Sequence, residues 1–216
     1  MKALLWDLDD TLLNTLPARM HALGYAYEKC MGSRTDPVAL WRSHRGGTLE
    51  DLGRRLMGND YAKFAATYRD CYYGAQRSIR PYPGIEAVLE ACLEVEVPMA
   101  VVTSKVAWGA TEELLQADLL RYFQAVIGFD DTDLHKPDPD PIYMAMERLA
   151  LADPAALILV GDSPADIWAA RNAGCISVAA MWGTLDAELV MDAMPDFRID
   201  TPEEIFAIVR GEAVAR

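Results

Sequence analysis

The 216-residue sequence predicts an α/β fold, a parallel sheet covered by helices, with an all-helical domain inserted after the first strand. Two observations predict this fold class. From residue 85 onward, short apolar runs alternate with stretches of helical periodicity, which is the pattern of a βα repeat and therefore of a parallel sheet. Between the first apolar run and this repeat lies a block, residues 14–80, whose apolar residues recur at helical spacing without any strand-like run.

The first strand is expected at residues 3–8, where Ala-Leu-Leu-Trp-Asp-Leu forms an apolar run that ends among acids. Residues 80–84, Arg-Pro-Tyr-Pro-Gly, cannot continue a helix and mark a domain boundary. We therefore expect an α/β core domain of residues 1–13 and 81–216, with a helical domain of residues 14–80 inserted into it. Gly-Ser and Gly-Asn pairs divide the helical domain into expected helices at 17–31, 37–57 and 60–78.

Strand-like and helical runs alternate through the rest of the core domain. We expect strands at 97–103, 125–128, 156–161 and 176–180, and helices at 85–94, 106–117, 140–150 and 165–173. Residues 197–199 are expected to form an edge strand before a last helix at 202–210. Trp108 and Trp168 fall on helical faces that we expect to pack in the core.

The composition excludes several classes of protein. With 52% hydrophobic and 25% charged residues, the chain matches ordinary folded globular proteins. Its net charge of −13 counts against non-specific binding to nucleic acid, which depends on contacts of Lys and Arg with the phosphates. No stretch approaches the roughly 18 apolar residues of a membrane span, so we expect no membrane association and a cytoplasmic location. Residues 14–79 nevertheless carry 10 Lys and Arg against 6 Asp and Glu, whereas the rest of the chain carries 10 against 27.

Polar side chains follow the predicted strands at their carboxyl ends, where α/β sheets bind ligands. The segments are residues 7–11 (DLDDT), 103–105 (TSK), 135–138 (HKPD) and 161–166 (GDSPAD). Together they supply carboxylates, a hydroxyl and an ammonium to one edge of the sheet. Several carboxylates held close together require a divalent cation that prefers oxygen ligands, which indicates Mg²⁺.

Asp7 and Asp9 indicate the class of reaction. Residues i and i+2 of an extended segment project to the same side, so two carboxylates can flank one reacting phosphorus. One can attack as a nucleophile, while the other handles the protons of the leaving oxygen and of the attacking water. Lys136 and Thr103 would complete a site for the phosphate group.

These motifs carry a family resemblance. DLDDTL at 7–12, Thr103-Ser104, the lysine of HKPDPDP and GDSPAD resemble, in this order, the four motifs of the haloacid dehalogenase superfamily. The helical domain resembles the α-helical cap that the phosphoglycolate phosphatase-like branch inserts after the first strand of its Rossmann-like core.

The resemblance implies Mg²⁺ as cofactor and a role for each motif residue. Asp7 would be the nucleophile and a metal ligand, and Asp9 the acid and base, with its backbone carbonyl on the metal. Asp162 would be a further metal ligand. The other roles would be phosphate binding by Thr103, Lys136 and the backbone N–H of Ser104, and support of the metal site or of Lys136 by Asp166.

The second aspartate narrows the expected activity. Dehalogenases of the superfamily lack this second aspartate, and its presence counts against a phosphonatase as well. The resemblance therefore implies a phosphatase of small anionic phosphorylated metabolites. Phosphoglycolate-like acids are the first candidates for the substrate. A pyrophosphatase and a nucleotidase remain alternatives, because the resemblance extends to relatives with these activities. A β-phosphoglucomutase-like sugar phosphomutase also remains, because nothing near Asp7 reports the lifetime of a phospho-enzyme. A non-enzymatic sensor of phosphorylated ligands would not need Asp7, Asp9, Lys136 and Asp162 intact. The sequence leaves open a monomer or a homodimer.

Within the helical domain, residues 42–48 (RSHRGGT) are expected to face the active site. Glycines interrupt helices, and cationic side chains suit an anionic substrate. Arg45, together with His44, would then bind a second anionic group of the substrate. The alternative is a plain surface loop.

Overall fold

The computed structural model describes residues 2–44 and 48–211, which form two compact units. The core unit comprises Met1–Asn14 and Arg80–Arg216, and the cap unit comprises Thr15–Ile79. Among the described residues, no helix combines the length and the apolar character that crossing a membrane requires.

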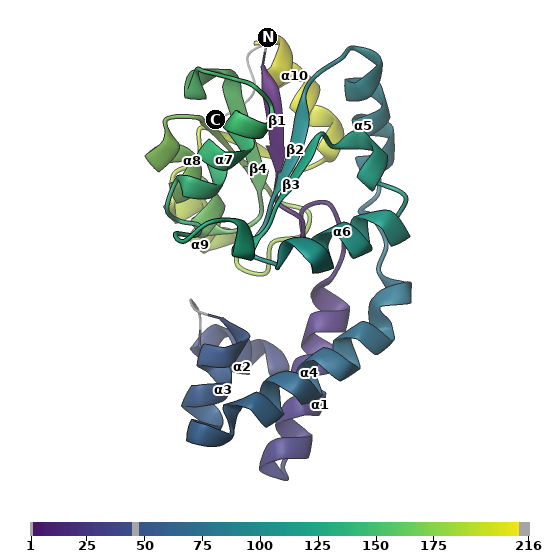
Figure 1. The fold of residues 1–216 in the computed structure, drawn as a ribbon, viewed down its shortest axis with the longest axis vertical. Helices are drawn as coiled ribbons and strands as arrows, with labels where there is room; N and C mark the ends of the chain where they lie inside the picture. The colour runs from purple at the N-terminus through teal and green to yellow at the C-terminus, as the bar shows by residue number, and fades with distance from the viewer. Residues whose placement is uncertain (1, 45–47, 212–216) are drawn as a thin grey trace. The chain divides into compact units, whose positions relative to one another are not determined.

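The core unit is built on a six-stranded sheet in which every pair of neighbouring strands is parallel, in the order β3-β2-β1-β4-β5-β6 (Figure 1). The strands are β1 (Ala3–Trp6), β2 (Met99–Val102), β3 (Ala125–Ile127), β4 (Leu157–Gly161), β5 (Ile176–Ala180) and β6 (Phe197–Ile199). All residues of β1 and β2 are buried. These central strands read as continuous apolar runs because helices cover both faces of a parallel sheet.

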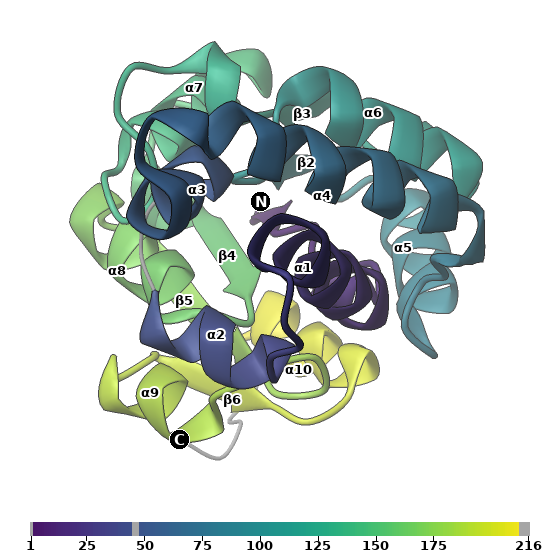
Figure 2. The same ribbon diagram turned by 90° about the horizontal axis from the view of Figure 1, so that it is seen from below.

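Helices connect the strands and cover the sheet. They are α5 (Ile85–Glu94), α6 (Ala107–Gln116), α7 (Asp140–Arg148), α8 (Pro164–Ala173), α9 (Ala187–Asp192) and α10 (Ile205–Arg210). Figures 1 and 2 show α7 and α8 against one face of the sheet and α5 and α10 against the other. Ile142 of α7 and Ala169 of α8 pack with alternate residues of the central strands, such as Leu5 and Leu159.

The cap unit consists of helices alone within its described residues. They are α1 (Leu16–Met31), α2 (Pro37–Ser43), α3 (Leu49–Met57) and α4 (Tyr61–Ala75). Leu23 of α1, Leu52 of α3 and Phe64 of α4 share one apolar cluster, so the cap unit has its own small core. A capping box, in which Thr48 and Asp51 bond each other's backbone N–H, begins α3.

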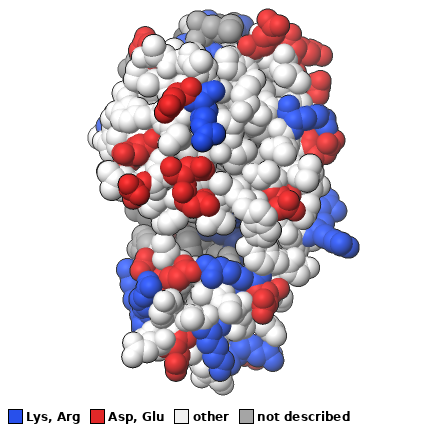
Figure 3. Space-filling model, viewed as in Figure 1, with Lys and Arg blue, Asp and Glu red and all other residues white. Residues whose placement is uncertain are grey.

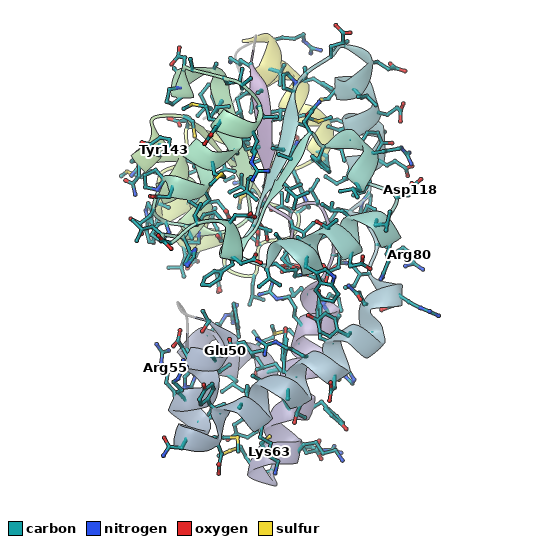
Figure 4. The ribbon with its side chains drawn as sticks, viewed as in Figure 1. Glu50, Arg55, Lys63, Arg80, Asp118 and Tyr143 are labelled. Carbon is teal, nitrogen blue, oxygen red and sulfur yellow. The ribbon has the colours of Figure 1, made fainter. Side chains whose placement is uncertain are left out.

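The two chain segments that lead into and out of the cap unit are hydrogen-bonded to each other. The Asn14 N–H donates to the carbonyl of Arg80 at 2.9 Å, and the Tyr82 N–H donates to the carbonyl of Leu12 at 3.0 Å. Arg80, labelled in Figure 4, is therefore the residue at which the chain returns to the core unit beside its point of departure.

The α/β fold with its parallel sheet is confirmed, but three details differ from the sequence prediction. The helix expected at 37–57 is two helices, because α2 ends at Ser43. Helix α9 was not predicted. Trp108 and Trp168 are 64% and 45% exposed rather than packed in the core. Small neighbours occupy the buried faces of these helices, Gly109 and Ala110 in α6 and Ala169 and Ala170 in α8.

Candidate active site

The expected site residues of three motifs lie at the carboxyl edge of the central strands. The Asp7 N–H donates to the carbonyl of Val160 at 2.9 Å, so the residue extends the pairing of β1 with β4 by one step. The Thr103 N–H likewise continues β2, donating to the carbonyl of Ile127. Asp162 directly follows β4. Because β1 lies between β2 and β4, the chain places all three residues at the point where the strand order reverses, the usual ligand site of such sheets.

Lys136 lies against Asp7 although 129 positions separate them. Its Nζ is 2.6 Å from Asp7 Oδ1, 2.6 Å from Asp166 Oδ1 and 3.0 Å from the carbonyl oxygen of Val102. An ammonium has three N–H donors, and these three acceptors match them in number. The Lys136 side chain is only 4% exposed, so its contacts with both carboxylates are largely shielded from water.

Burial and charge act in opposite directions on this group. The pKa of Asp7 is raised to about 7, mainly by burial; the ammonium of Lys136 opposes this rise, and the charges of Asp166 and Asp9 add to it. Burial disfavours the charged form of Lys136, but the carboxylates of Asp166 and Asp7 outweigh this effect and raise its pKa. The pKa of Asp7 therefore lies near neutral pH. An additional cation beside Asp7 would favour its charged form.

Asp166 connects helix α8 to Lys136. Its Oδ2 accepts hydrogen bonds from the backbone N–H of Ser163 at 3.1 Å and from the Ser163 hydroxyl at 2.6 Å, which forms the capping box of α8. Its Oδ1 contacts Lys136. A Cβ at Gly161 would lie 2.3 Å from Asp166 Cγ, so the glycine of the GDSPAD motif leaves the space that this carboxylate occupies.

Three carboxylates are close enough to share a cation. Asp7, Asp162 and Asp166 each offer an oxygen, and these atoms all lie within 4.8 Å of one another. Asp162 Oδ1 also accepts from the Thr11 hydroxyl at 3.2 Å, which orients it. Both oxygens of Asp166 already have protein partners, so Asp7 and Asp162 are the better ligands. An all-oxygen donor set of this kind fits Mg²⁺.

Asp9 has a different neighbour from Asp7. Its Oδ1 is 2.9 Å from the Nζ of Lys105, and the same ammonium donates to Glu113 of helix α6. Sequence reasoning assigned neither Lys105 nor Glu113 a role. A signal was present for Glu113, since this acid stands on the face of α6 that also carries Ala110 and Leu114, which is the buried face.

The expected phosphate ligands lie at the end of β2. Thr103 is buried, and its hydroxyl oxygen accepts the Lys105 N–H at 3.2 Å, which leaves the hydroxyl proton to be donated elsewhere. Ser104 is exposed. Arg45, expected to bind the far end of the substrate, lies outside the described residues. His44 directly follows α2 in the cap unit, with its Nδ1 2.6 Å from the hydroxyl of Ser43.

The cap unit bears the charges expected of it. Lys and Arg side chains are prominent on the face of the cap unit shown in Figure 3, whereas acids predominate on the same face of the core unit. Two cations of the cap unit are engaged within it: Arg69 of α4 pairs with Glu50 of α3, and the Arg54 guanidinium lies 4.2 Å from the ring centroid of Tyr61. Glu50, Arg55 and Lys63 are labelled in Figure 4.

Comparisons with known proteins agree with this geometry. A family model described as haloacid dehalogenase-like hydrolase matches residues 4–180. A protein provisionally named pyrophosphatase PpaX from Caldanaerobacter subterraneus is 34% identical over 212 residues, covering 97% of this chain and 94% of that protein. A phosphoglycolate phosphatase from Neisseria meningitidis is 33% identical over 220 residues, covering 95% and 92%. The crystal structure of a predicted phosphoglycolate phosphatase from Haemophilus somnus superposes with a TM-score of 0.86 at 26% identity, covering 96% of this chain and 97% of that one.

Proposed function

This chain belongs to the haloacid dehalogenase-like hydrolase family, and we propose that it is a Mg²⁺-dependent phosphatase of small phosphorylated metabolites, working through an aspartyl-phosphate on Asp7. The observation that carries the proposal is the pair Asp7 and Asp9, which stand two residues apart and contact different lysines, Lys136 and Lys105. Separate lysines allow the two carboxylates to take separate roles.

The first half of the proposed reaction forms the covalent intermediate. An oxygen of Asp7 attacks the phosphorus of the monoester, and the bond from phosphorus to the ester oxygen breaks. Asp9, protonated at this stage, gives its proton to that oxygen as it leaves, so an alcohol and not an alkoxide is released. Lys136 holds the attacking carboxylate in place through its Oδ1 contact.

The second half regenerates the enzyme. Asp9, now a carboxylate, takes a proton from a water molecule whose oxygen attacks the phosphorus of the aspartyl-phosphate. The bond between phosphorus and the Asp7 oxygen breaks, inorganic phosphate leaves, and Asp7 is again a carboxylate while Asp9 is again protonated. The Asp9 side chain is 21% exposed, which is compatible with access for both the leaving group and water.

Asp7 and Asp162, with the backbone carbonyl of Asp9, are the residues that would hold Mg²⁺. When bound, the ion supplies charge that offsets the repulsion between the phosphate dianion and the Asp7 carboxylate. The Thr103 hydroxyl and the Ser104 N–H would donate to the phosphate oxygens. Because Lys136 is engaged by three protein acceptors, we assign it mainly to Asp7 and to the charge balance around the phosphate.

The substrate class rests on the relatives and on charge. Relatives at 33–34% identity carry the names phosphoglycolate phosphatase and pyrophosphatase, so compact, strongly anionic phosphates are the first candidates. The basic cap unit is the source of partners for a second anionic group, with His44 and Arg45 as candidates. A sugar phosphomutase remains the alternative within the family. The cytoplasmic location and the choice between monomer and homodimer stay predictions from the sequence.

A phosphate-release assay over a panel of substrates tests the proposal. The panel should hold phosphoglycolate, pyrophosphate, nucleoside monophosphates and sugar phosphates, each with Mg²⁺, with Ca²⁺ and with excess chelator. We expect turnover with Mg²⁺, loss of turnover in chelator, and inhibition by Ca²⁺, whose looser and higher coordination misplaces nucleophile and phosphate. Full activity in chelator would overturn the metal requirement, and isomerisation of a sugar phosphate without phosphate release would identify a mutase.

A further inference from the structure

The site contains two lysines in matching surroundings. Lys136 lies between Asp7 and the buried acid Asp166, and Lys105 lies between Asp9 and the buried acid Glu113. In each case an ammonium joins one carboxylate of the catalytic pair to a second carboxylate anchored in a helix, α8 or α6. The first arrangement belongs to the four motifs of the family. The second lies outside them.

Glu113 has no evident place in the chemistry itself. It is not among the carboxylates that could share a cation, which are Asp7, Asp162 and Asp166 among the described residues. Its side chain is 1% exposed on the buried face of α6. A buried carboxylate costs stability unless it is paired, and an apolar residue would suit this position better for packing alone. Its contact with Lys105 therefore indicates that Glu113 serves to hold this lysine in place.

Lys105 is charged and held from two sides. Burial disfavours its charged form, but the carboxylates of Asp9 and Glu113 outweigh that effect and raise its pKa. Its backbone is fixed as well, because the Lys105 N–H donates to the Thr103 hydroxyl oxygen and the Lys105 carbonyl accepts from Phe129 N–H at 2.8 Å. The ammonium is thus a rigid point against which the Asp9 carboxylate rests.

We propose that Lys105, anchored by Glu113, is a positioning residue that holds the Asp9 carboxyl for proton transfer to the leaving oxygen and from the attacking water. The inference rests on the proposed role of Asp9 as acid and base. The contact of 2.9 Å between the Lys105 Nζ and Asp9 Oδ1 fixes the orientation of the carboxyl group that would exchange the proton. Without Lys105, Asp9 can rotate toward the cations beside Asp7, where it would not face the leaving group.

Substrates differ in how much their leaving group needs a proton, and this difference allows the role of Lys105 to be tested. An alkyl phosphate such as phosphoglycolate needs a proton on its leaving oxygen, whereas p-nitrophenolate leaves as the anion. Hydrolysis of the aspartyl-phosphate needs Asp9 as base with either substrate. Loss of positioning should therefore slow both half-reactions with an alkyl phosphate, but only the second with p-nitrophenyl phosphate.

The decisive variant is Lys105→Met, which keeps most of the length of the side chain and removes its charge. We expect kcat for an alkyl phosphate to fall about 100-fold, with little change in KM. With p-nitrophenyl phosphate we expect a rapid burst of p-nitrophenolate, about one per enzyme, followed by slow turnover, and phosphorylated enzyme trapped by acid quench. Glu113→Gln should show the same pattern with a smaller loss, and Lys105→Arg should recover part of the rate.

Asp9→Asn, measured in parallel, separates the possible failures. If Asp9→Asn gives no burst of p-nitrophenolate before slow turnover, the proposed role of Asp9 is wrong. If Asp9→Asn shows the burst while Lys105→Met loses activity equally on both substrates without a burst, or loses none, the positioning role is overturned. Should Lys105→Met fail to fold, Glu113→Gln and Lys105→Arg decide, because both keep a polar group on each side of the contact. Wild-type burst behaviour in both would contradict the inference.

Discussion

Asp7 and Asp9 stand two residues apart, yet their surroundings differ. Asp7 is buried and held by Lys136, whereas Asp9 is half-buried and held by Lys105. A nucleophile benefits from a fixed position and from the removal of water around it. An acid and base must exchange protons with groups that enter and leave, which a partly exposed carboxyl can do. The difference in burial thus supports the proposed division of roles.

Removal of the Asp7 charge should abolish turnover and stabilise the fold. Asp7→Asn lacks the attacking carboxylate, so we expect kcat to fall by about a thousandfold or more. In metal-free buffer at pH 8, the variant should unfold at a higher temperature than the wild type. Burial raises the folded-state pKa of Asp7 from 3.8 to about 7, so stability present below the unfolded-state pKa is lost as the pH rises through 7. An uncharged Asn avoids this loss.

Thermal unfolding of both proteins at pH 5 and pH 8, in chelator, measures the effect. The advantage of Asp7→Asn should grow between the two pH values. A variant that is less stable than the wild type by the same amount at both would contradict the raised pKa. A variant that hydrolyses phosphoglycolate at the wild-type rate would contradict covalent catalysis on Asp7.

At the scale of elements, the loop after β1 is held by the segment after β5. The Trp182 Nε1–H donates to the carbonyl of Thr11 at 2.9 Å. Gly183 approaches the same loop so closely that a Cβ there would lie 1.8 Å from the backbone oxygen of Asp10. Asp10 itself has φ 65°, a left-handed conformation that Asp tolerates better than most residues. The position of Asp9 therefore depends on a backbone contact from a distant segment.

Gly183→Ala should displace this loop. The added methyl group meets backbone, which cannot move aside without shifting Asp9 and Asp10, so we expect a loss of about 2 kcal/mol in the free energy of unfolding and a kcat lowered at least tenfold. Gly74→Ala is the matched control. It lies near the end of α4 with no atom within 4 Å of an added Cβ, so a gain of up to about 1 kcal/mol and unchanged kcat are expected. Equal effects of the two substitutions would show that the contact does not hold the loop.

Periodicity allowed most elements to be predicted, and its failures have physical causes. Buried parallel strands such as β1 and β4 are continuous apolar runs between polar ends, a pattern that is visible in one sequence. Helix α9 has six residues and only Val190 among them is buried, so no helical period marks it in the sequence. The contact of Lys105 with Asp9 and Glu113 was missed because it joins three elements, and a lysine beside a motif reads as a surface charge until the fold brings acids to it.

At the scale of the whole molecule, charge is divided between the two units. The residues of the cap unit carry a balance of +4, whereas the remaining residues carry −17. Within the core unit, the acids that surround Asp7 would repel an anionic substrate unless cations offset them. The proposed Mg²⁺ and the two lysines provide that offset for the phosphate group. The cap unit carries 10 of the 20 Lys and Arg residues and is the unit with a net positive balance, so it is the proposed source of substrate selection.

Excision of the cap unit separates chemistry from selection. Asn14 and Arg80 are joined by a backbone hydrogen bond of 2.9 Å, so residues 15–79 can be replaced by a short Gly-Ser linker without opening the sheet. The cap unit also has its own apolar cluster, which leaves the core of the sheet intact when it is removed. We expect the shortened protein to fold and to hydrolyse p-nitrophenyl phosphate in a Mg²⁺-dependent manner, because Asp7, Asp9 and both lysines remain.

Selection should be lost in the same protein. In the wild type, part of the binding energy of phosphoglycolate is expected to come from groups outside the core unit, and this energy raises kcat/KM only for substrates with a second anionic group. The ratio of kcat/KM for phosphoglycolate to that for p-nitrophenyl phosphate should therefore fall at least about tenfold on excision. An unchanged ratio in a folded, active core would show that the core unit alone determines substrate selectivity. Asp7→Asn in the shortened protein is the control, since residual activity in it would belong to a contaminant.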